Sequence, residues 1–326
     1  MADAKIKISD EVLEDYKKTA IQWEPVLLDL PLRAAADVLK FFSPVPGLRG
    51  KKRFGAVSAQ SQFAPFDKHR VSEATVKIDY REIETFHGNV VETFSPVDYI
   101  DLPMGYDDPI LGDAIKNAST TALVLMKLAA ARGQFIAQAA FTGKRNADGT
   151  TTADICDGLI TIADKEIAAG TMTTAIGNLY EVTDEVTKAN AVDIAKDIVF
   201  SMNPFLRRAN NVMLVDQDFV DKYNEGYLLT HEGIVYNTKY DQPFVEGSNH
   251  KLTLIPVPEL EGTKTAIITQ RDNLLYGFDN KSRESFCDIM RTGHYELSFA
   301  QDIFLGFQFR TIDPRRLRIV KFKGKE

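Results

Sequence analysis

The chain has 326 residues, enough for one large domain or two of ordinary size. Its 44% hydrophobic and 26% charged content is typical of a globular protein, and its net charge of −7 argues against a dedicated nucleic-acid binder. The two cysteines, Cys156 and Cys287, give neither a disulfide framework nor a metal spacing, which indicates a reducing, cytosolic context. We expect no signal peptide, because the N-terminus is acidic and polar, and no membrane span, because no apolar run reaches the ~18 residues required.

Two basic clusters depart from this acidic average. We expect both to be solvated surface charge, with contact to a phosphate or an acidic partner as the alternative. The first cluster comprises Arg49, Lys51, Lys52 and Arg53, and the second comprises Arg315, Arg316, Arg318, Lys321, Lys323 and Lys325.

The N-terminal segment predicts two short helices. Ser9 or Asp10 can cap the first, which starts near Glu11 and places its acids before its bases, as the helix dipole favours. The second is predicted over residues 32–42 and ends before Pro44.

Residues 48–73 have no strong periodicity and are rich in basic and small polar residues. A stretch of this length is unusual inside a compact monomer, so it predicts an extended arm or loop that packs on something else. The alternating residues 76–81 and the run 90–94 predict a β-ribbon, with a turn at residues 87–89.

A long, alanine-rich helix is predicted over residues 109–142. Pro109 suits its first turn, Gly143 suits a left-handed stop, and the length would be roughly 50 Å. Because only Lys127 is charged between residues 122 and 131, we expect neighbouring elements to cover this spine helix on most sides. Its small side chains allow those neighbours to approach closely.

The remainder of the chain predicts mixed α/β structure followed by long terminal strands. Every odd position from 295 to 309 is apolar except Gln301, which argues for long antiparallel strands with one buried face. Further helices are predicted over residues 191–202 and 218–227, and further strands over 212–215, 252–257, 265–269, 274–278 and 318–322.

No motif in the sequence predicts catalysis. A phosphate-binding loop, a GxGxxG turn, a GxSxG elbow and a zinc-binding HExxH helix are all absent, and the five histidines form no evident ligand set. Cys156, although flanked by aspartates, is predicted to be a small buried apolar residue. Phe54, Phe63 and Phe66 are predicted to pack rather than to stack on bases. We therefore predict no catalytic, cofactor-binding or metal-binding residue.

The order of these parts resembles the major capsid proteins of tailed bacteriophages, which have the Hong Kong 97-like fold. The resemblance is carried by four segments: VKIDYREIETFHGNVVETFSPVDY, the helix ending AQAAFTGKRNADGTTT, the strand DNLLYGFDN, and ELSFAQDIFLGFQFRTIDPRRLRIVKF. It implies an α+β fold in five parts. These are an N-terminal arm (1–47), an extended E-loop and β-ribbon (48–95), a peripheral domain with the spine helix (96–149), an axial domain (150–290) and terminal strands returning to the peripheral domain (291–326).

The resemblance also implies a function. The chain would be a non-enzymatic major capsid protein that assembles through hexamers and pentamers into an icosahedral shell around phage double-stranded DNA, in the host cytoplasm. Because the chain begins directly with the arm, a separate scaffolding protein is expected, and portal and decoration proteins are further expected partners; no membrane and no cofactor is implied. Some family members form a Lys–Asn crosslink between subunits, but no asparagine follows Asn280.

Contacts between subunits are predicted to use the basic loop and an acidic patch before the spine helix. An acidic subunit repels its copies, so attraction between unlike local patches is needed. The alternatives are an encapsulin-like cellular shell that encloses cargo enzymes, and a cytosolic enzyme of unknown activity. The candidate contact residues are Arg49, Lys51, Lys52, Arg53, Phe54, Asp98, Asp101, Asp107 and Asp108.

Overall fold

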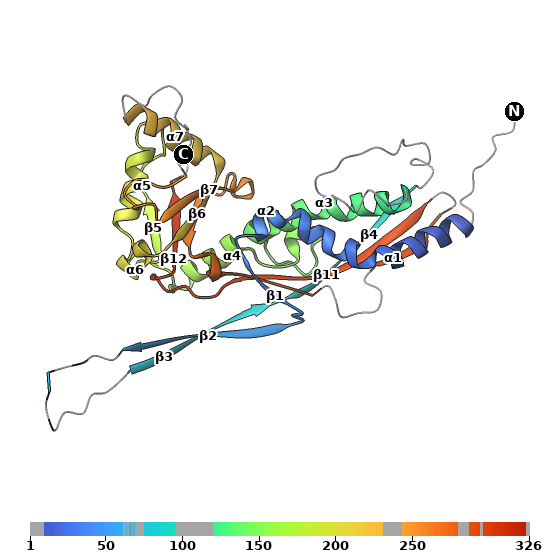
Figure 1. Cartoon of the computed structure of the whole chain (residues 1–326), viewed down its shortest axis with the longest axis horizontal. Helices are drawn as coiled ribbons and strands as arrows, with labels where there is room; N and C mark the ends of the chain where they lie inside the picture. The colour runs from blue at the N-terminus through green and yellow to red at the C-terminus, as the bar shows by residue number, and fades with distance from the viewer. Residues whose placement is uncertain are drawn as a thin grey trace.

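The computed structural model describes residues 10–60, 63, 65–66, 68, 75–95, 120–230, 243–279, 287–293 and 296–323. The molecule is elongated (Figure 1), with a long platform of helices on a sheet, a compact α/β unit at one end and a two-stranded ribbon that projects from the body. Within the described residues, no helix is long and apolar enough to cross a membrane.

The platform is built around the long strand β11 (Leu297–Phe309). Strand β4 (Phe86–Phe94) pairs antiparallel with one edge of β11, while β10 (Cys287–Arg291) and β9 (Leu274–Asp279) follow one another along the other edge. The short strand β1 (Ser43–Pro46) adds to β9 in parallel. The apolar odd positions of β11 are buried, apart from the half-buried Ile303, so the predicted one-sided burial is confirmed.

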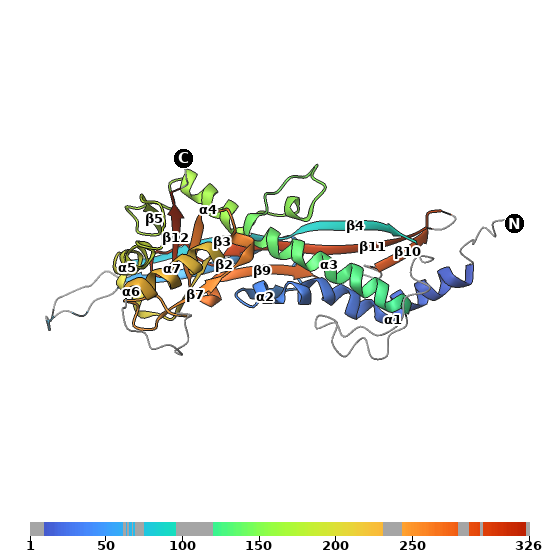
Figure 2. The same cartoon turned by 90° about the horizontal axis from the view of Figure 1, so that it is seen from above.

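Two helices lie side by side on this sheet (Figure 2): α1 (Asp10–Ala34) and α3 (Thr120–Thr142). In α3, Leu125, Met126 and Ala129 are fully buried between α1 and the sheet, which confirms the covered spine helix. A β-carbon at Gly133 would lie 2.3 Å from the Ala34 β-carbon, so this glycine permits the close approach of the two helices. The predicted first part of the spine, residues 109–119, lies outside the described residues.

The two short N-terminal helices were a wrong prediction. A single helix, α1, runs for 25 residues through Pro25 and Pro31, and only the four-residue α2 (Ala36–Leu39) follows it. Proline removes a helical hydrogen bond, so Pro31 leaves the carbonyl of Leu27 without its usual donor. The side-chain amide of Gln301 on β11 donates to that carbonyl at 3.0 Å. Packing on α3 and this outside donor therefore allow the helix to continue where sequence rules would end it.

Gln301 also connects the sheet to α3. Its amide oxygen accepts from Nη1 of Arg132, whose Nη2 donates to Glu92 of β4 at 2.8 Å. The Arg132 guanidinium lies over the Phe299 ring at 4.8 Å. The one polar exception in the apolar run of β11 is thus buried, with both ends of its amide hydrogen-bonded.

The compact unit contains a five-stranded sheet in the order β5-β12-β8-β6-β7. Among its described elements, the strands at 211–215, 252–256, 265–269 and 317–322 and the helices at 191–200 and 217–230 match the sequence prediction closely, whereas the strand at 179–182 and the helices at 159–168 and 204–208 were not predicted. The strands are β5 (Leu179–Val182), β6 (Asn211–Val215), β7 (Leu252–Pro256), β8 (Thr265–Thr269) and β12 (Leu317–Phe322), and the helices are α4 (Leu159–Ala168), α5 (Ala191–Phe200), α6 (Pro204–Arg208) and α7 (Gln217–Thr230), with short 3-10 turns at Thr152–Asp154, Pro258–Leu260 and Arg271–Asn273.

The structure corrects the expected solvation of the C-terminal basic cluster. Arg318 is 3% exposed, its Nη1 donates to the carbonyl of Ile198 at 3.4 Å, and its guanidinium lies over the Tyr180 ring at 4.7 Å. Burial lowers the pKa of Arg318. Lys321 pairs with Asp164 at 2.7 Å. This part of the cluster thus belongs to the packing of β12 rather than to a free surface.

The ribbon is paired differently from the prediction. Strand β3 (Thr75–Glu84) pairs with β2 (Lys51–Gln60), inside the stretch expected to be irregular. The expected turn at residues 87–89 lies within β4, where the long ladder with β11 overrides the local turn signal. Gly88 has a different role, because a β-carbon there would lie 2.5 Å from Cδ1 of Ile155.

The Gln301 contacts predict a specific coupling. Gln301→Leu should lower the free energy of unfolding by about 2 kcal/mol, because it leaves the Leu27 carbonyl and part of Arg132 buried without partners. Adding Pro31→Ala supplies a backbone N–H to the Leu27 carbonyl, so the double variant should recover about 1 kcal/mol beyond additivity. Urea unfolding of both single variants, the double variant and the control Gln134→Leu measures this. Strict additivity would show that the Leu27 carbonyl does not link the two residues.

Candidate assembly surfaces

The ribbon is held firmly where it joins the platform. Thr85, which links β3 to β4, donates from Oγ1 to the Leu48 carbonyl at 2.8 Å and accepts from the Gly50 N–H at 3.1 Å. Its own N–H donates to the Gly50 carbonyl at 2.9 Å. Thr85 is 5% exposed and Ile83 beside it is fully buried. The two strands of the ribbon therefore leave the body from a fixed root.

Arg81 ties β3 to the end of β11. Its Nε donates to the Phe309 carbonyl at 3.1 Å, and its Nη2 donates to Gln308 at 2.9 Å and to Glu166 of α4 at 2.8 Å. Burial alone would raise the pKa of Glu166, but hydrogen bonding from Thr171 and the charge of Arg81 outweigh it and hold that pKa below its usual value. Gln308 in turn donates from Nε2 to the Glu82 carbonyl at 3.1 Å.

Two glycines opposite one another in the sheet make room for the backbone that passes over them between β3 and β4. Gly277 of β9 and Gly306 of β11 are direct partners in the ladder. A β-carbon on Gly306 would lie 2.0 Å from the Glu84 carbonyl oxygen, and one on Gly277 would lie 2.8 Å from Cγ2 of Thr85. This glycine pair lets the backbone between β3 and β4 lie directly on the sheet.

The structure places most of the basic loop residues against acids of the same chain. Arg49 pairs with the buried carboxylate of Asp279, Lys51 pairs with Glu84 at 3.3 Å, and Arg53 pairs with Glu82 at 2.5 Å. The hydrogen bond and charge of Arg53 lower the pKa of Glu82, although both groups are exposed and such surface pairs add little stability.

Lys52 and Phe54 complete the predicted loop set. The Lys52 ammonium lies 5.5 Å from the Phe54 ring centroid, and Lys52 forms no ion pair within the described part of the chain. Phe54 packs beside the small cluster of Val45, Leu48 and Ile83. The predicted acidic partners lie outside the described residues, so their contact with the loop stays a prediction: Asp98, Asp101, Asp107 and Asp108.

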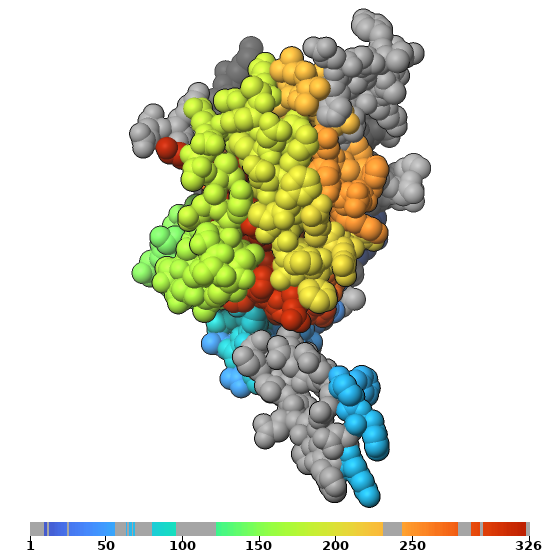
Figure 3. All heavy atoms as spheres, turned by 90° about the vertical axis from the view of Figure 1, so that its left-hand side faces the viewer, coloured from blue at the N-terminus to red at the C-terminus, as the bar shows by residue number. Residues whose placement is uncertain are grey.

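The far end of the ribbon carries unburied apolar surface. Phe63 and Phe66, in the segment between β2 and β3, are 108% and 96% exposed. Figure 3, viewed from the end that carries the compact unit, shows the ribbon reaching well below the body. Sequence reasoning identified both residues as packing residues, yet no described part of the chain covers them.

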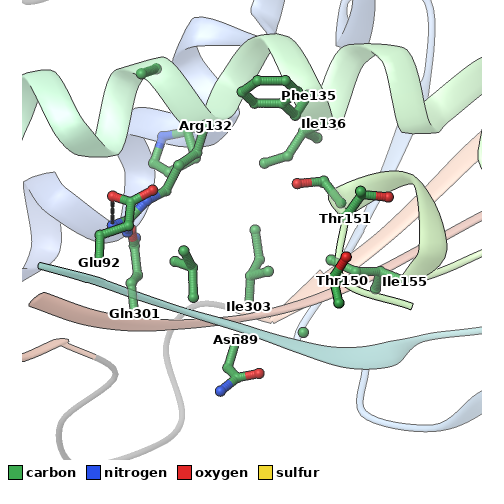
Figure 4. A pocket seen from close by; sticks show the side chains of 15 residues that line it. Asn89, Glu92, Arg132, Phe135, Ile136, Thr150, Thr151, Ile155, Gln301 and Ile303 are labelled. Atoms are coloured by element: carbon green, nitrogen blue, oxygen red, sulfur yellow. Dashed lines mark hydrogen bonds and ion pairs between the residues drawn. The ribbon is translucent and has the colours of Figure 1, made fainter. Parts of the chain in front are cut away.

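A groove lies between α3, β4 and the loop that follows α3 (Figure 4), with a volume of about 330 Å³. Phe135, which is 57% exposed, and Ile136 line it from the helix, and Ile155 and Ile303 line it from the opposite side. The Arg132–Glu92 pair closes its polar end. Sequence reasoning missed this groove, because it is formed by elements far apart in the chain.

The structure offers no assembled chemical centre within its described residues. No group of three or more His, Cys, Asp or Glu side chains there could hold a metal ion. Cys156 is buried as predicted, and burial raises the pKa of its thiol to about 12, which leaves it unreactive at neutral pH.

Comparison with known proteins identifies the fold. No family model and no curated protein sequence matches the chain. A chain of the satellite phage P4 procapsid with size determination (Sid) protein superposes with a TM-score of 0.58 at 14% identity, over 92% of this chain and 90% of that chain. Chains from Mycobacterium phage Adephagia and Microbacterium phage Oxtober96 each superpose with a TM-score of 0.50 at 11% identity, over 89% and 88% of this chain and 90% of each of those chains.

The chain has the Hong Kong 97-like capsid fold. The α+β class and the order of N-terminal arm, ribbon, spine helix and mixed α/β unit are thereby confirmed. At 11–14% identity the likeness establishes architecture alone.

The glycine pair gives a direct test of the ribbon root. Gly306→Ala should lower the free energy of unfolding by about 1–3 kcal/mol, because a methyl group there must displace the Glu84 backbone. Gly293→Ala is the control, since its β-carbon would meet only ordinary contacts at 3.4 Å and beyond. Thermal melting and limited proteolysis within residues 48–84 report both effects. Equal melting of the two variants would show that the ribbon does not rest on the sheet as described.

Proposed function

We propose that the chain is a structural subunit of an icosahedral phage capsid and not an enzyme. The observation that supports this most directly is the ribbon, which is fixed at its root and carries fully exposed phenylalanines at its far end. Exposed aromatic groups on a projecting element are costly in a monomer and are stabilised by burial against a neighbour. The shared fold with a procapsid chain points the same way.

In this proposal the subunits form hexamers and pentamers that close into a shell around double-stranded DNA. The five parts inferred from the sequence would act as arm, extended loop, peripheral domain, axial domain and returning strands. Assembly would take place in the host cytoplasm, with the virion as the final location. A separate scaffolding protein, a portal and decoration proteins are proposed partners.

Negative-stain microscopy of the purified chain over a range of concentrations tests the proposal. Rings or closed shells support it. A sharp monomer peak in sedimentation at every concentration and salt condition, in the presence and absence of a coexpressed scaffold candidate, contradicts it. Analysis of shell contents then separates a DNA-filled capsid from an encapsulin-like compartment that holds cargo enzymes.

The ribbon phenylalanines should govern assembly but not folding. Replacing Phe63 and Phe66 with serine removes two aromatic rings from the proposed interface, each worth about 1.5–3 kcal/mol when fully buried. We expect a normal melting temperature and at least tenfold weaker association. The control replaces Ile176 and Leu229, which are exposed apolar residues on the compact unit, with serine. Sedimentation velocity measures both variants, and unchanged association of the phenylalanine variant would rule out this use of the ribbon.

The proposed charge pairing between loop and acidic patch is tested best at Lys52, because Arg49, Lys51 and Arg53 already pair within the chain. Lys52→Glu should slow assembly at low salt, and adding Asp107→Lys and Asp108→Lys should partly restore it. Lys323→Glu, an exposed reversal elsewhere, serves as the control. Light scattering follows the rate, and normal assembly of Lys52→Glu at low salt would refute the pairing.

A further inference from the structure

A basic pocket opens on the compact unit, away from the ribbon root and the groove. It has a volume of about 400 Å³ and is lined by Pro204, Arg207 and Arg208 around α6 and by Ser248, Asn249 and Lys251 before β7. No acidic residue lines it, and none of its three cations forms an ion pair within the described residues. In a chain of net charge −7, such a concentration of unpaired positive charge is an exception.

The two sides of this pocket are joined by one buried residue, Asn211. Its Nδ2 donates to the carbonyl of Leu206, and also to that of Ala209 at 3.1 Å, which fixes the end of α6. Its backbone N–H donates to the Lys251 carbonyl at 2.8 Å. The spacing between Arg208 and Lys251 is therefore set by the body of the fold, not by a loose loop.

Arg207 is held in place before any ligand arrives. Its Nη2 donates to the Gly247 carbonyl at 3.3 Å, and its guanidinium lies over the Phe200 ring at 4.8 Å. Gly247 allows this arrangement, because a β-carbon there would lie 3.1 Å from the Phe200 ring. A cation that is already oriented loses little conformational freedom on binding, which favours affinity.

The neighbouring residues complete the positive environment. Arg315 lies over the exposed Phe205 ring at 5.1 Å, so the C-terminal basic cluster contributes a further cation next to α6. Asn249 and His250 adopt left-handed backbone angles, with φ of 52° and 60°, which turns the chain tightly at the pocket wall. The Asn249 amide adds a neutral donor that can bind an oxyanion.

We propose that this pocket binds a phosphate group. Phosphate carries up to two negative charges and several acceptor oxygens, and guanidinium and ammonium groups are its usual protein donors. A lone carboxylate would use fewer of these donors. The phosphate is either a soluble ion or a phosphodiester of nucleic acid. The site is independent of the proposed shell function, because a single subunit contains all of it.

Calorimetric titration of the full chain with pyrophosphate at low salt tests the site. We expect saturable binding to the native protein. A variant with Arg208→Gln and Lys251→Gln should bind about tenfold more weakly or worse, the effect of losing at least one charge-assisted hydrogen bond. The matched control replaces two exposed lysines elsewhere, Lys17 and Lys144, with glutamine and should bind like the native chain. Equal melting temperatures confirm that all three proteins are folded.

A second arm identifies the source of the phosphate. Fluorescence anisotropy of a labelled single-stranded oligonucleotide, with pyrophosphate as competitor, is measured on the same three proteins. If pyrophosphate displaces the oligonucleotide from the native protein, and the variant at Arg208 and Lys251 shows no such displacement, the site binds nucleic-acid phosphate. If the native protein binds pyrophosphate but not the oligonucleotide, the site binds a soluble anion. Absence of saturable pyrophosphate binding, or equal weakening in the control, overturns the proposal.

Discussion

The platform depends on the side chain of Gln301. It is a buried amide in an otherwise apolar run, and it contacts both platform helices through groups that would be costly to leave unpaired. The Leu27 carbonyl has no helical donor because of Pro31, and Arg132 of α3 brings a positive charge against the sheet. One amide satisfies both, with its nitrogen facing one helix and its oxygen facing the other. Apolar packing brings α1, α3 and β11 together, and this hydrogen-bonding geometry selects their register.

The ribbon root depends on the absence of side chains at two glycines as much as on hydrogen bonds. Gly277 and Gly306 remove side chains from two paired strands, and the backbone of Glu84 and Thr85 fills the space. Arg81 then fastens the crossing to the end of β11. The result is an element that is well supported at its root and carries the exposed Phe63 and Phe66 at its far end. Such a distribution suits a contact with another molecule.

The sequence predicted elements whose signals are local. The alternation along β11 and the periodic helices of the compact unit needed no knowledge of partners. Prediction from the sequence failed where residues far apart in the chain determine the secondary structure. The length of α1 depends on Gln301, which lies 270 positions after Pro31. The strand at residues 87–89 depends on pairing with β11, and Gly88 serves a close contact with Ile155 rather than a turn.

The candidate surfaces show the same division. The basic loop was evident from composition, but its pairing with Asp279, Glu84 and Glu82 was not, because those acids come from other strands. The C-terminal basic run separates into the buried Arg318 and the surface Arg315 once β12 takes its place in the sheet. Charge patterns in the sequence identify where cations occur, but only the fold determines which of these cations remain available to bind another molecule.

The central position of β11 has a consequence for the order of events during synthesis. This strand comes from the last thirty residues of the sequence, yet β4, β9 and β10 pair with it directly. Pairing across some two hundred residues gives the platform a high contact order, which slows folding. A growing chain cannot finish the platform sheet, or fix the ribbon through Gln308 and Phe309, until β11 has been synthesised. The projecting surface is therefore presented in its final geometry only by chains that include β11, so products truncated before this strand lack the support of the ribbon root.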